Sequence, residues 1–136
     1  MQKFSDNQVA LISGGTSGIG FATAELLLKQ GWCVVINGRN EWDGQEAVVK
    51  LRRISSKVRF VQGDVSKVMN CRRIVEDTIR LFGNLNALVT AAGYYEERLL
   101  EDVDEQNFDE MFGTNVKGTV FLCQAAAPYL KQVHGS

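Results

Sequence analysis

Short apolar runs alternate with longer amphipathic segments along the chain, and this alternation predicts its architecture. Apolar runs of strand length occupy residues 9–13, 33–36, 58–62 and 85–91. Apolar residues at helical spacing predict helices over residues 18–30, 42–54, 67–82 and 104–132. Because strands and helices alternate, we expect an α/β fold with a doubly wound parallel sheet and helices on both faces. Right-handed crossovers give this sheet the strand order 3-2-1-4.

The apolar residues of each expected helix indicate which face packs on the sheet. The first two helices carry Ile19, Ala22 and Leu26, and Ala47, Leu51 and Ile54, respectively. The third carries Cys71, Val75, Ile79 and Phe82, and the last carries Phe108, Met111, Phe112, Thr119 and Leu122. Gly113 and Gly118 predict close packing or a local irregularity inside the last helix, and Pro128 predicts a bend or a restart. Ser66 is placed to cap the third helix, and Gly31 to end the first in a left-handed conformation.

Composition narrows the classes of protein that fit this pattern. The 136 residues suffice for one domain, and a formal net charge of -1 gives no reason to expect a nucleic acid or an acidic membrane as partner. No apolar run reaches the ~20 residues that span a bilayer, and residues 1–6 lack an apolar signal core. Cys33, Cys71 and Cys123 are widely spaced and odd in number, so we expect buried thiols rather than disulfides or metal ligands. The protein is therefore predicted to be cytoplasmic and to hold no metal.

The first strand runs into three glycines spaced G-x-x-x-G-x-G at the start of a helix, which is the strongest chemical signal in the chain. Gly14 allows a sharp turn off the strand, and Gly18 or Gly20 allows a ligand or the helix to approach the backbone closely. The helix start offers unpaired N–H groups and a positive dipole end to a diphosphate, and the hydroxyls of Thr16 and Ser17 could bind its oxygens. We therefore expect a dinucleotide site; the alternative is a turn that only packs the helix on the sheet.

Four segments resemble motifs of the short-chain dehydrogenase/reductase (SDR) family in their order and spacing. Residues 13–20, S-G-G-T-S-G-I-G, are similar to the family's T-G-x-x-x-G-I-G turn, and Asp64-Val65 to its acidic-apolar pair. Residues 88–93, L-V-T-A-A-G, resemble its L-V-N-N-A-G segment, with Thr90 and Ala91 in place of two asparagines, and residues 115–118 match its N-x-x-G. The resemblance implies a single, incomplete Rossmann-like NAD(P)-binding domain over residues 1–136. It also implies an oxidoreductase that transfers a hydride between a nicotinamide and an alcohol or carbonyl substrate.

The same resemblance implies roles for individual residues. Asp64 would accept a hydrogen bond from the adenine amino group while Val65 packs on the ring; alternatively, Asp64 is an ordinary turn acid. Ile19 would press on the cofactor or on the sheet. Backbone contacts to the cofactor are implied at Ala91, Ala92 and Gly93. Asn115 would hold the helix irregularity and a water that relays protons, or it is simply a polar residue on a partner-facing side.

The end of the second strand bears on the choice between NADP and NAD. Residues 37–40, N-G-R-N, offer no acid where an Asp or Glu would bond the ribose hydroxyls of NAD. Gly38 precedes Arg39, whose guanidinium suits a 2′-phosphate unless it is only a solvated cation. We therefore expect NADP, while Glu41 and Asp43 a little further on keep NAD open.

The family's catalytic group is an asparagine, a serine and a Tyr-x-x-x-Lys pair, and only the asparagine has a counterpart here, Asn115. Tyr94, Tyr95 and Tyr129 are followed four places on by arginine, leucine and valine. We expect the chain to be the cofactor-binding part of a longer enzyme or a truncated product, inactive by itself. A non-catalytic nucleotide-binding module and an assembly fragment that binds nothing well are the alternatives. With residues 87–91 as an open apolar edge, we also expect a homo-oligomer formed through that edge or the last helix.

Overall fold

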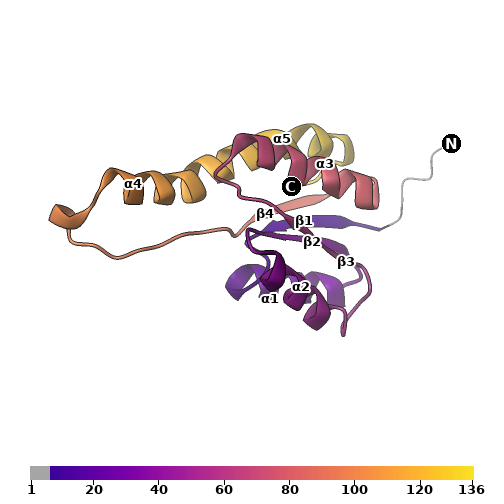
Figure 1. The fold of residues 1–136 in the computed structure, drawn as a ribbon. Helices are drawn as coiled ribbons and strands as arrows, with labels where there is room; N and C mark the ends of the chain where they lie inside the picture. The colour runs from indigo at the N-terminus through magenta and orange to yellow at the C-terminus, as the bar shows by residue number, and fades with distance from the viewer. Residues whose placement is uncertain (1–6) are drawn as a thin grey trace.

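Four parallel strands form a single sheet in the order β3-β2-β1-β4 in the computed structural model, which describes residues 7–136 (Figure 1). The strands are β1 (Val9–Ser13), β2 (Cys33–Gly38), β3 (Val58–Gln62) and β4 (Ala87–Thr90). Leu11 of β1 lies between Val35 of β2 and Leu88 of β4. The predicted fold class and strand order are therefore confirmed. The prediction for residues 1–6 lies outside the described part of the chain.

Two helical layers cover the sheet. α1 (Gly18–Lys29) and α2 (Glu41–Leu51) lie on one face, and α3 (Val68–Phe82) and α5 (Gly118–Val133) lie on the other (Figure 1). Leu11 belongs to the core under α3 and α5, whereas its neighbour Ile12 belongs to the core under α1 and α2. All five residues of β1 are buried, because an inner strand of a parallel sheet is covered on both faces. This explains why its sequence is continuously apolar.

α1 packs through a different face from the predicted one. Ile19 and Leu26 are 82% and 56% exposed, whereas the buried residues are Gly20, Ala24 and Leu28. The small residues at the first two of these positions allow a close approach of helix and sheet. Apolar residues occur all around α1, so periodicity does not single out its packed face. The faces predicted for α2 and α3 are confirmed by the burial of Ala47, Leu51, Cys71 and Val75.

The predicted long last helix is divided by a π-helical segment. A 3₁₀ turn, η1 (Leu100–Asp102), precedes α4 (Glu105–Phe112), and the π-helical η2 (Gly113–Lys117) links α4 to α5. The irregularity predicted between the two glycines is therefore confirmed. The wider π turn shifts the phase of the helical faces, so Leu122 is buried, whereas Phe108 and Phe112, which were predicted on the same side, are each 51% exposed. Pro128 lies inside α5, which continues past it without a restart.

Two smaller predictions are wrong. Ser66 does not cap α3, which begins two residues later without a side-chain cap; its hydroxyl bonds to Asp64 instead (2.7 Å). Cys123 is exposed, whereas the other two cysteines are buried as predicted. The end of α1 follows the prediction, because Gly31 has a φ of 89°.

The outer edge of β4 is not fully open, contrary to the prediction. The Leu88 N–H donates to the carbonyl of Ser136 (2.9 Å), and the Ser136 N–H donates to the carbonyl of Asn86 (3.0 Å). These two bonds occupy the start of the edge in the way that a neighbouring parallel strand would. Thr90, at the end of the strand, is exposed.

Candidate functional site

The carboxyl ends of the four strands surround a cavity of about 240 Å³. In open parallel sheets this is where ligands bind, beside the point at which the strand order reverses. Of the residues predicted to bind, five line the cavity from β1 and β2: Gly14, Thr16, Ser17, Gly38 and Arg39. Four more line it from β3 and β4: Asp64, Val65, Ala92 and Gly93. The fold thus brings together four segments that are far apart in the sequence.

The structure requires glycine at positions 14, 18 and 20 of the turn after β1 for three different reasons. Gly14 has a φ of 64°, and a Cβ there would stand 2.6 Å from the carbonyl oxygen of Ala91. Its absence lets the turn pack directly against the chain that follows β4. Gly20 is buried, and a Cβ there would collide with the backbone of Gly14. Gly18 has a φ of 55° and nothing within 4 Å of a Cβ position, so its requirement is conformational and the space beside it is open.

Within residues 7–136, no side chain caps the N-terminus of α1. Ser17 is the N-cap residue, but its side chain makes no capping bond, and the first turn contains no acidic residue. The first N–H groups of the helix and its positive dipole end are therefore left for an external anion. Gly18, Ile19, Gly20 and Ala91 are not among the residues that line the cavity.

A buried asparagine fixes the end of β2 against β3. Asn37, 1% exposed, donates from Nδ2 to the carbonyls of Val61 (3.0 Å) and Gly63 (3.1 Å). Its own carbonyl accepts from the N–H of Gly15 (3.0 Å). A Cβ on Gly38 would stand 2.8 Å from the Thr16 Cγ2, so the turn and β2 are in close contact. These hydrogen bonds fix the glycine turn and the end of β2, which Arg39 follows, relative to each other.

Asp64 is held as a carboxylate between two cations. Burial raises the pKa of this carboxyl, but the hydrogen bonds from Ser66 and the charges of Arg39 and Lys67 outweigh that effect, and the pKa lies below its ordinary value. Both bonds from Ser66, from N (2.9 Å) and from Oγ (2.7 Å), go to Oδ1. Oδ2 makes no hydrogen bond within residues 7–136 and is left for a ligand.

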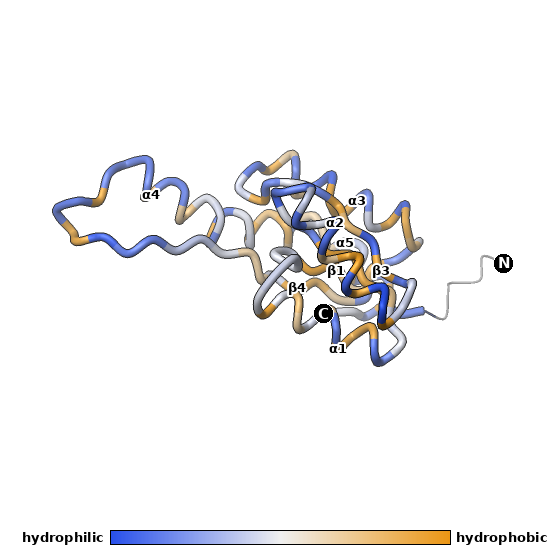
Figure 2. Tube along the Cα trace, turned by 60° about the horizontal axis from the view of Figure 1, so that its bottom comes forward, coloured by the Kyte–Doolittle hydropathy of each residue, from blue (hydrophilic) through white to orange (hydrophobic). Residues whose placement is uncertain are grey.

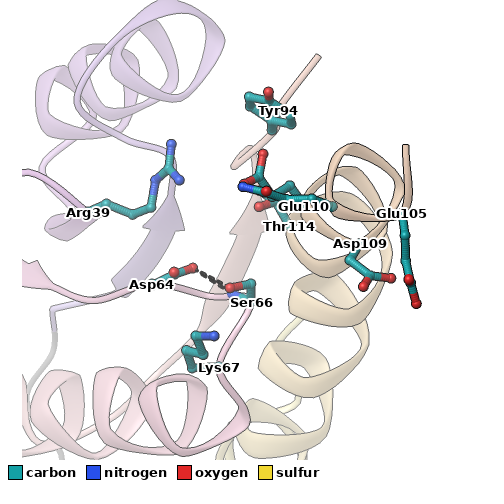
Figure 3. A pocket seen from close by; sticks show the side chains of 10 residues that line it. Arg39, Asp64, Ser66, Lys67, Tyr94, Glu105, Asp109, Glu110 and Thr114 are labelled. Carbon is teal, nitrogen blue, oxygen red and sulfur yellow. Dashed lines mark hydrogen bonds between the residues drawn. The ribbon is translucent and has the colours of Figure 1, made fainter. Parts of the chain in front are cut away.

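A second, larger hollow of about 610 Å³ adjoins the first and shares Arg39, Asp64 and Thr114 with it. Figure 3 shows Arg39 and Lys67 on the side of the sheet, with acidic side chains of α4 across from them. Glu105, Asp109 and Glu110 are these acidic residues. The hollow therefore has Arg39, Asp64 and Lys67 on one side and the carboxylates of α4 on the other, and it shares Arg39 and Asp64 with the 240 Å³ cavity.

Asn115 holds the loop after β4 through two backbone bonds. Its Oδ1 accepts from the N–H of Tyr94 (2.8 Å), and its Nδ2 donates to the carbonyl of the same residue (2.7 Å). Asn115 is an exposed residue. Because Asn115 lies in η2, the π-helical irregularity is tied to the loop that carries Gly93 into the cavity. The proton-relay role stays a prediction.

Sequence reasoning missed several residues that line the cavity. Asn37, Asn40, Gly63 and Thr114 were given no place in it, and Asp43 was named only as a residue that keeps NAD open. Asn40 carried a recognisable signal, since it precedes a helix, and it caps α2 by accepting from the N–H of Asp43 (3.1 Å). Thr114 carried none, because its position depends on the phase of the π-helical segment.

A glycine turn at a bare helix N-terminus, at the switch point of a 3-2-1-4 sheet, defines a Rossmann-type dinucleotide-binding domain. The family model for short chain dehydrogenase matches residues 8–136, and the chain belongs to the short-chain dehydrogenase/reductase family. No helix within residues 7–136 is long and apolar enough to cross a bilayer. The cytoplasmic location stays a prediction.

The relatives are dehydrogenases and reductases. The chain is 37% identical over 130 residues to 11-beta-hydroxysteroid dehydrogenase A of Sesamum indicum, covering 94% of this chain and 37% of that protein. It is 38% identical over 125 residues to a peroxisomal 2,4-dienoyl-CoA reductase of Arabidopsis thaliana, covering 92% and 42%. The structure of an NADH-dependent reductase, A1-R′, complexed with NAD superposes with a TM-score of 0.85 at 29% identity, covering 93% of this chain and 54% of that one. The chain thus spans about half or less of the length of these relatives.

Proposed function

We propose that this chain is the cofactor-binding part of an SDR oxidoreductase that transfers a hydride between NADP(H) and an alcohol or carbonyl substrate. The observation that carries the proposal is the 240 Å³ cavity, in which a glycine turn, a cation and a carboxylate meet at one end of the sheet. Family membership and a neighbour complexed with NAD support a nicotinamide dinucleotide as the ligand.

The residues of the cavity fit such a ligand. The open space beside Gly18 and the uncapped start of α1 suit a diphosphate. Oδ2 of Asp64 suits the amino group of adenine. Val65 lines the same wall, but it is only 5% exposed and packs in the core under α3 and α5. When bound, the nicotinamide supplies or accepts the hydride. The chain's own share is to fix the dinucleotide; Asn115, through its clamp on Tyr94, holds the wall formed by the loop after β4.

Arg39 favours NADP over NAD in this proposal. Its guanidinium lines both hollows and lies close enough to Asp64 to lower the pKa of that carboxyl. A 2′-phosphate would gain a charge-assisted hydrogen bond from this group. Asp43 lines the same cavity and is the residue that supports NAD as the second candidate, together with the NAD complex of the structural neighbour.

Isothermal titration calorimetry with NADPH and NADH tests the cofactor assignment. Arg39→Asp should weaken NADPH binding about 100-fold or more, because an attraction becomes a repulsion, while NADH binding changes less than about threefold. Arg53→Asp is the matched control, since Arg53 is also exposed but lines neither cavity. Equal losses for both dinucleotides would refute the NADP assignment, and no binding of either would refute the proposed function.

Catalysis is expected to require residues that these 136 positions do not contain. The sequence has no Tyr-x-x-x-Lys pair, so we propose that the chain by itself binds the dinucleotide without turning it over. Steady oxidation of NADPH by the purified chain with a carbonyl substrate would overturn this part of the proposal. The substrate is an alcohol or carbonyl compound by family analogy alone.

A homo-oligomer is proposed through one apolar stripe on the last helical segments. Phe108, Phe112, Val116 and Val120 follow one another at four-residue spacing and are 51%, 51%, 48% and 54% exposed. The rings of Phe108 and Phe112 stack with centroids 4.4 Å apart. A stripe of this kind suits a two-fold dimer, in which the same surface meets itself. Val116→Asp should reduce the mass measured by light scattering from that of a dimer to that of a monomer; an unchanged mass would contradict this interface.

A further inference from the structure

The loop and helix between β4 and η2 form an arm that extends away from the rest of the molecule. Figure 1 shows residues 93–112 leading out to η1 and returning through α4, on the side opposite β3. The arm is strongly acidic: residues 96–110 contain eight acidic side chains and one basic side chain. Its tip is nonetheless apolar, with Leu99 and Leu100 66% and 88% exposed. Figure 2 shows a hydrophobic segment at the far end of the arm, next to hydrophilic stretches of the chain.

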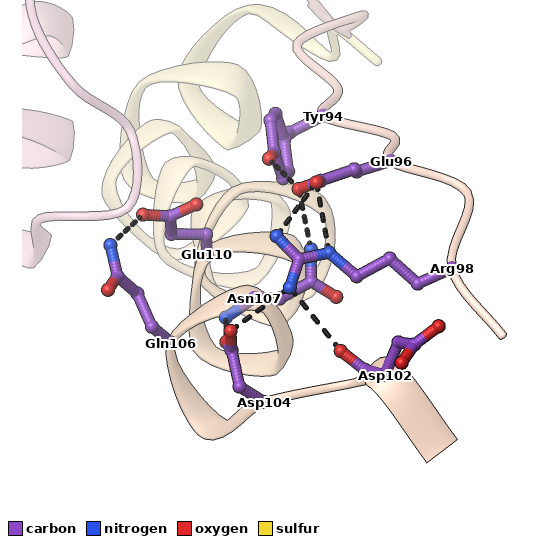
Figure 4. Close-up of polar contacts among 8 residues, drawn as sticks. All are labelled: Tyr94, Glu96, Arg98, Asp102, Asp104, Gln106, Asn107 and Glu110. Atoms are coloured by element: carbon purple, nitrogen blue, oxygen red, sulfur yellow. Dashed lines mark hydrogen bonds and ion pairs between the residues drawn. The ribbon is translucent and has the colours of Figure 1, made fainter. Parts of the chain in front are cut away.

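A network of polar contacts fixes the shape of the arm (Figure 4). Glu96 accepts from the Tyr94 hydroxyl (2.6 Å) and from Asn107 Nδ2 (2.8 Å), which connects the outgoing loop to α4. Arg98 bridges Glu96 (2.8 Å) and Asp104 (3.0 Å). A tip held in this way loses little conformational entropy when it binds a partner. The apolar tip is therefore exposed in a preorganised conformation.

Acidic side chains flank the tip without partners of their own. Glu97, Glu101 and Asp102 form no salt bridge with any residue of the described part of the chain. A surface that can receive this tip should have an apolar floor for two leucines and cations at its rim. Such a surface exists on the same chain, on the side of the molecule that lies away from the arm.

The groove between β3 and α3 has these properties. It has a volume of about 490 Å³, and Phe60, Val61 and Leu81 supply its apolar lining. Arg73 and Arg80 also line it, and they share the single carboxylate of Asp77 at 3.2 and 2.7 Å. The groove therefore keeps an excess of positive charge. The surrounding sequence is basic as well, because residues 50–80 contain nine basic and three acidic side chains.

We propose that the Leu99–Leu100 tip of one copy docks into the β3–α3 groove of a second copy. The tip and the groove of one molecule cannot meet, because Figures 1 and 2 both place the arm and β3 at opposite ends. Charge and apolarity match on the two surfaces, which favours this partner over an unrelated one. The contact joins two different surfaces, so it is head-to-tail and propagates into chains of copies unless a ring closes. The two-fold dimer proposed above stops at two copies, and the two modes are thereby distinguishable.

Sedimentation velocity of the 136-residue chain tests the proposal through its charges. The wild type should form species larger than a dimer as its concentration rises at low salt, and about 0.5 M NaCl should reverse this growth because exposed charges are screened. The arm variant Glu101→Lys with Asp102→Lys and the groove variant Arg73→Glu with Arg80→Glu should each lose the growth. An equimolar mixture of the two variants should regain it, since each now carries the complement of the other. Lys29→Glu, an exposed residue of α1 outside both surfaces, is the control and should behave as the wild type.

A second variant tests the apolar part without changing charge. Leu100→Ser should weaken the head-to-tail association about 10- to 100-fold, which corresponds to the free energy of burying one leucine side chain. Val49→Ser removes a comparably exposed aliphatic side chain (61%) from α2 and should have no effect. Far-UV circular dichroism verifies that each variant is folded. Growth that survives both charge variants, a mixture that fails to restore it, or a wild type that never exceeds a dimer would each overturn the proposal.

Discussion

Replacing Gly18 by alanine separates backbone strain from ligand contact at the glycine turn. Gly18 and Gly31 both lie in the left-handed region, with φ of 55° and 89°, and neither has an atom within 4 Å of a Cβ position. Alanine at either site therefore pays for backbone conformation alone, about 1–2 kcal/mol. For a domain of this size that corresponds to a fall in melting temperature of roughly 3–8 °C. The two variants should lose stability about equally.

Ligand binding should distinguish the two variants. Gly18 begins α1, where the free N–H groups face the proposed diphosphate, whereas Gly31 ends α1. A methyl group at position 18 occupies the open space through which the diphosphate approaches, and losing one charge-assisted hydrogen bond costs about 1.5–3 kcal/mol. NADPH should therefore bind about 10- to 100-fold more weakly to Gly18→Ala. Gly31→Ala should bind like the wild type.

Differential scanning calorimetry measures the stability of the two variants. NADPH titrations of both variants at the same temperature measure their affinities. Equal NADPH affinities of Gly18→Ala and Gly31→Ala would refute the reasoning, because the glycine would then serve the fold and not the ligand. A much larger stability loss at Gly18 would refute the structural premise that its surroundings are open.

Three further predictions test the structure around the site. Asn115→Ala should speed amide exchange at Tyr94 roughly fivefold, because the lost hydrogen bonds contribute about 1 kcal/mol; unchanged exchange would mean that the clamp is not formed in solution. The stability that Asp64 contributes is complete above its ordinary pKa of 3.8 and is lost as the pH falls through its lower folded value. Asp64→Asn should thus flatten the pH dependence of the free energy of unfolding below about pH 3.8, and urea titrations that show the same slope for both proteins would contradict this. A thiol reagent should modify Cys123 quickly and the two buried cysteines only after denaturation; three fast thiols would contradict the described burial.

The strands and their order were predictable because two simple physical rules determine them. A buried parallel strand is continuously apolar, and the handedness of crossovers leaves one strand order for four βα units. The segments around the cavity were predictable for the same reason: all of them follow carboxyl ends of strands, which must lie at one edge. The glycine turn, Arg39 and Asp64 are therefore found from sequence order alone.

The helical surfaces were harder to predict, since periodicity assumes a regular helix. In α1 apolar residues surround the helix, so Ile19 and Leu26 were placed on the packed face when they are exposed. In the last helix the π-helical segment shifts the phase, so Phe108 is exposed and Leu122 is buried, although both were predicted on one side of the helix. The pairing of Ser136 with β4 depends on tertiary contact after α5, which no local pattern encodes.

The proposed function requires NADPH to bind in the cavity at the carboxyl ends of the strands. The most direct test is an NMR titration of the isotope-labelled chain with NADPH. The largest amide shift changes should fall at residues 14–18, 38–39, 64–65 and 92–93, while the groove beside Phe60 stays unperturbed. Saturating NADPH that leaves these amides unchanged, or that shifts residues elsewhere instead, would contradict the account.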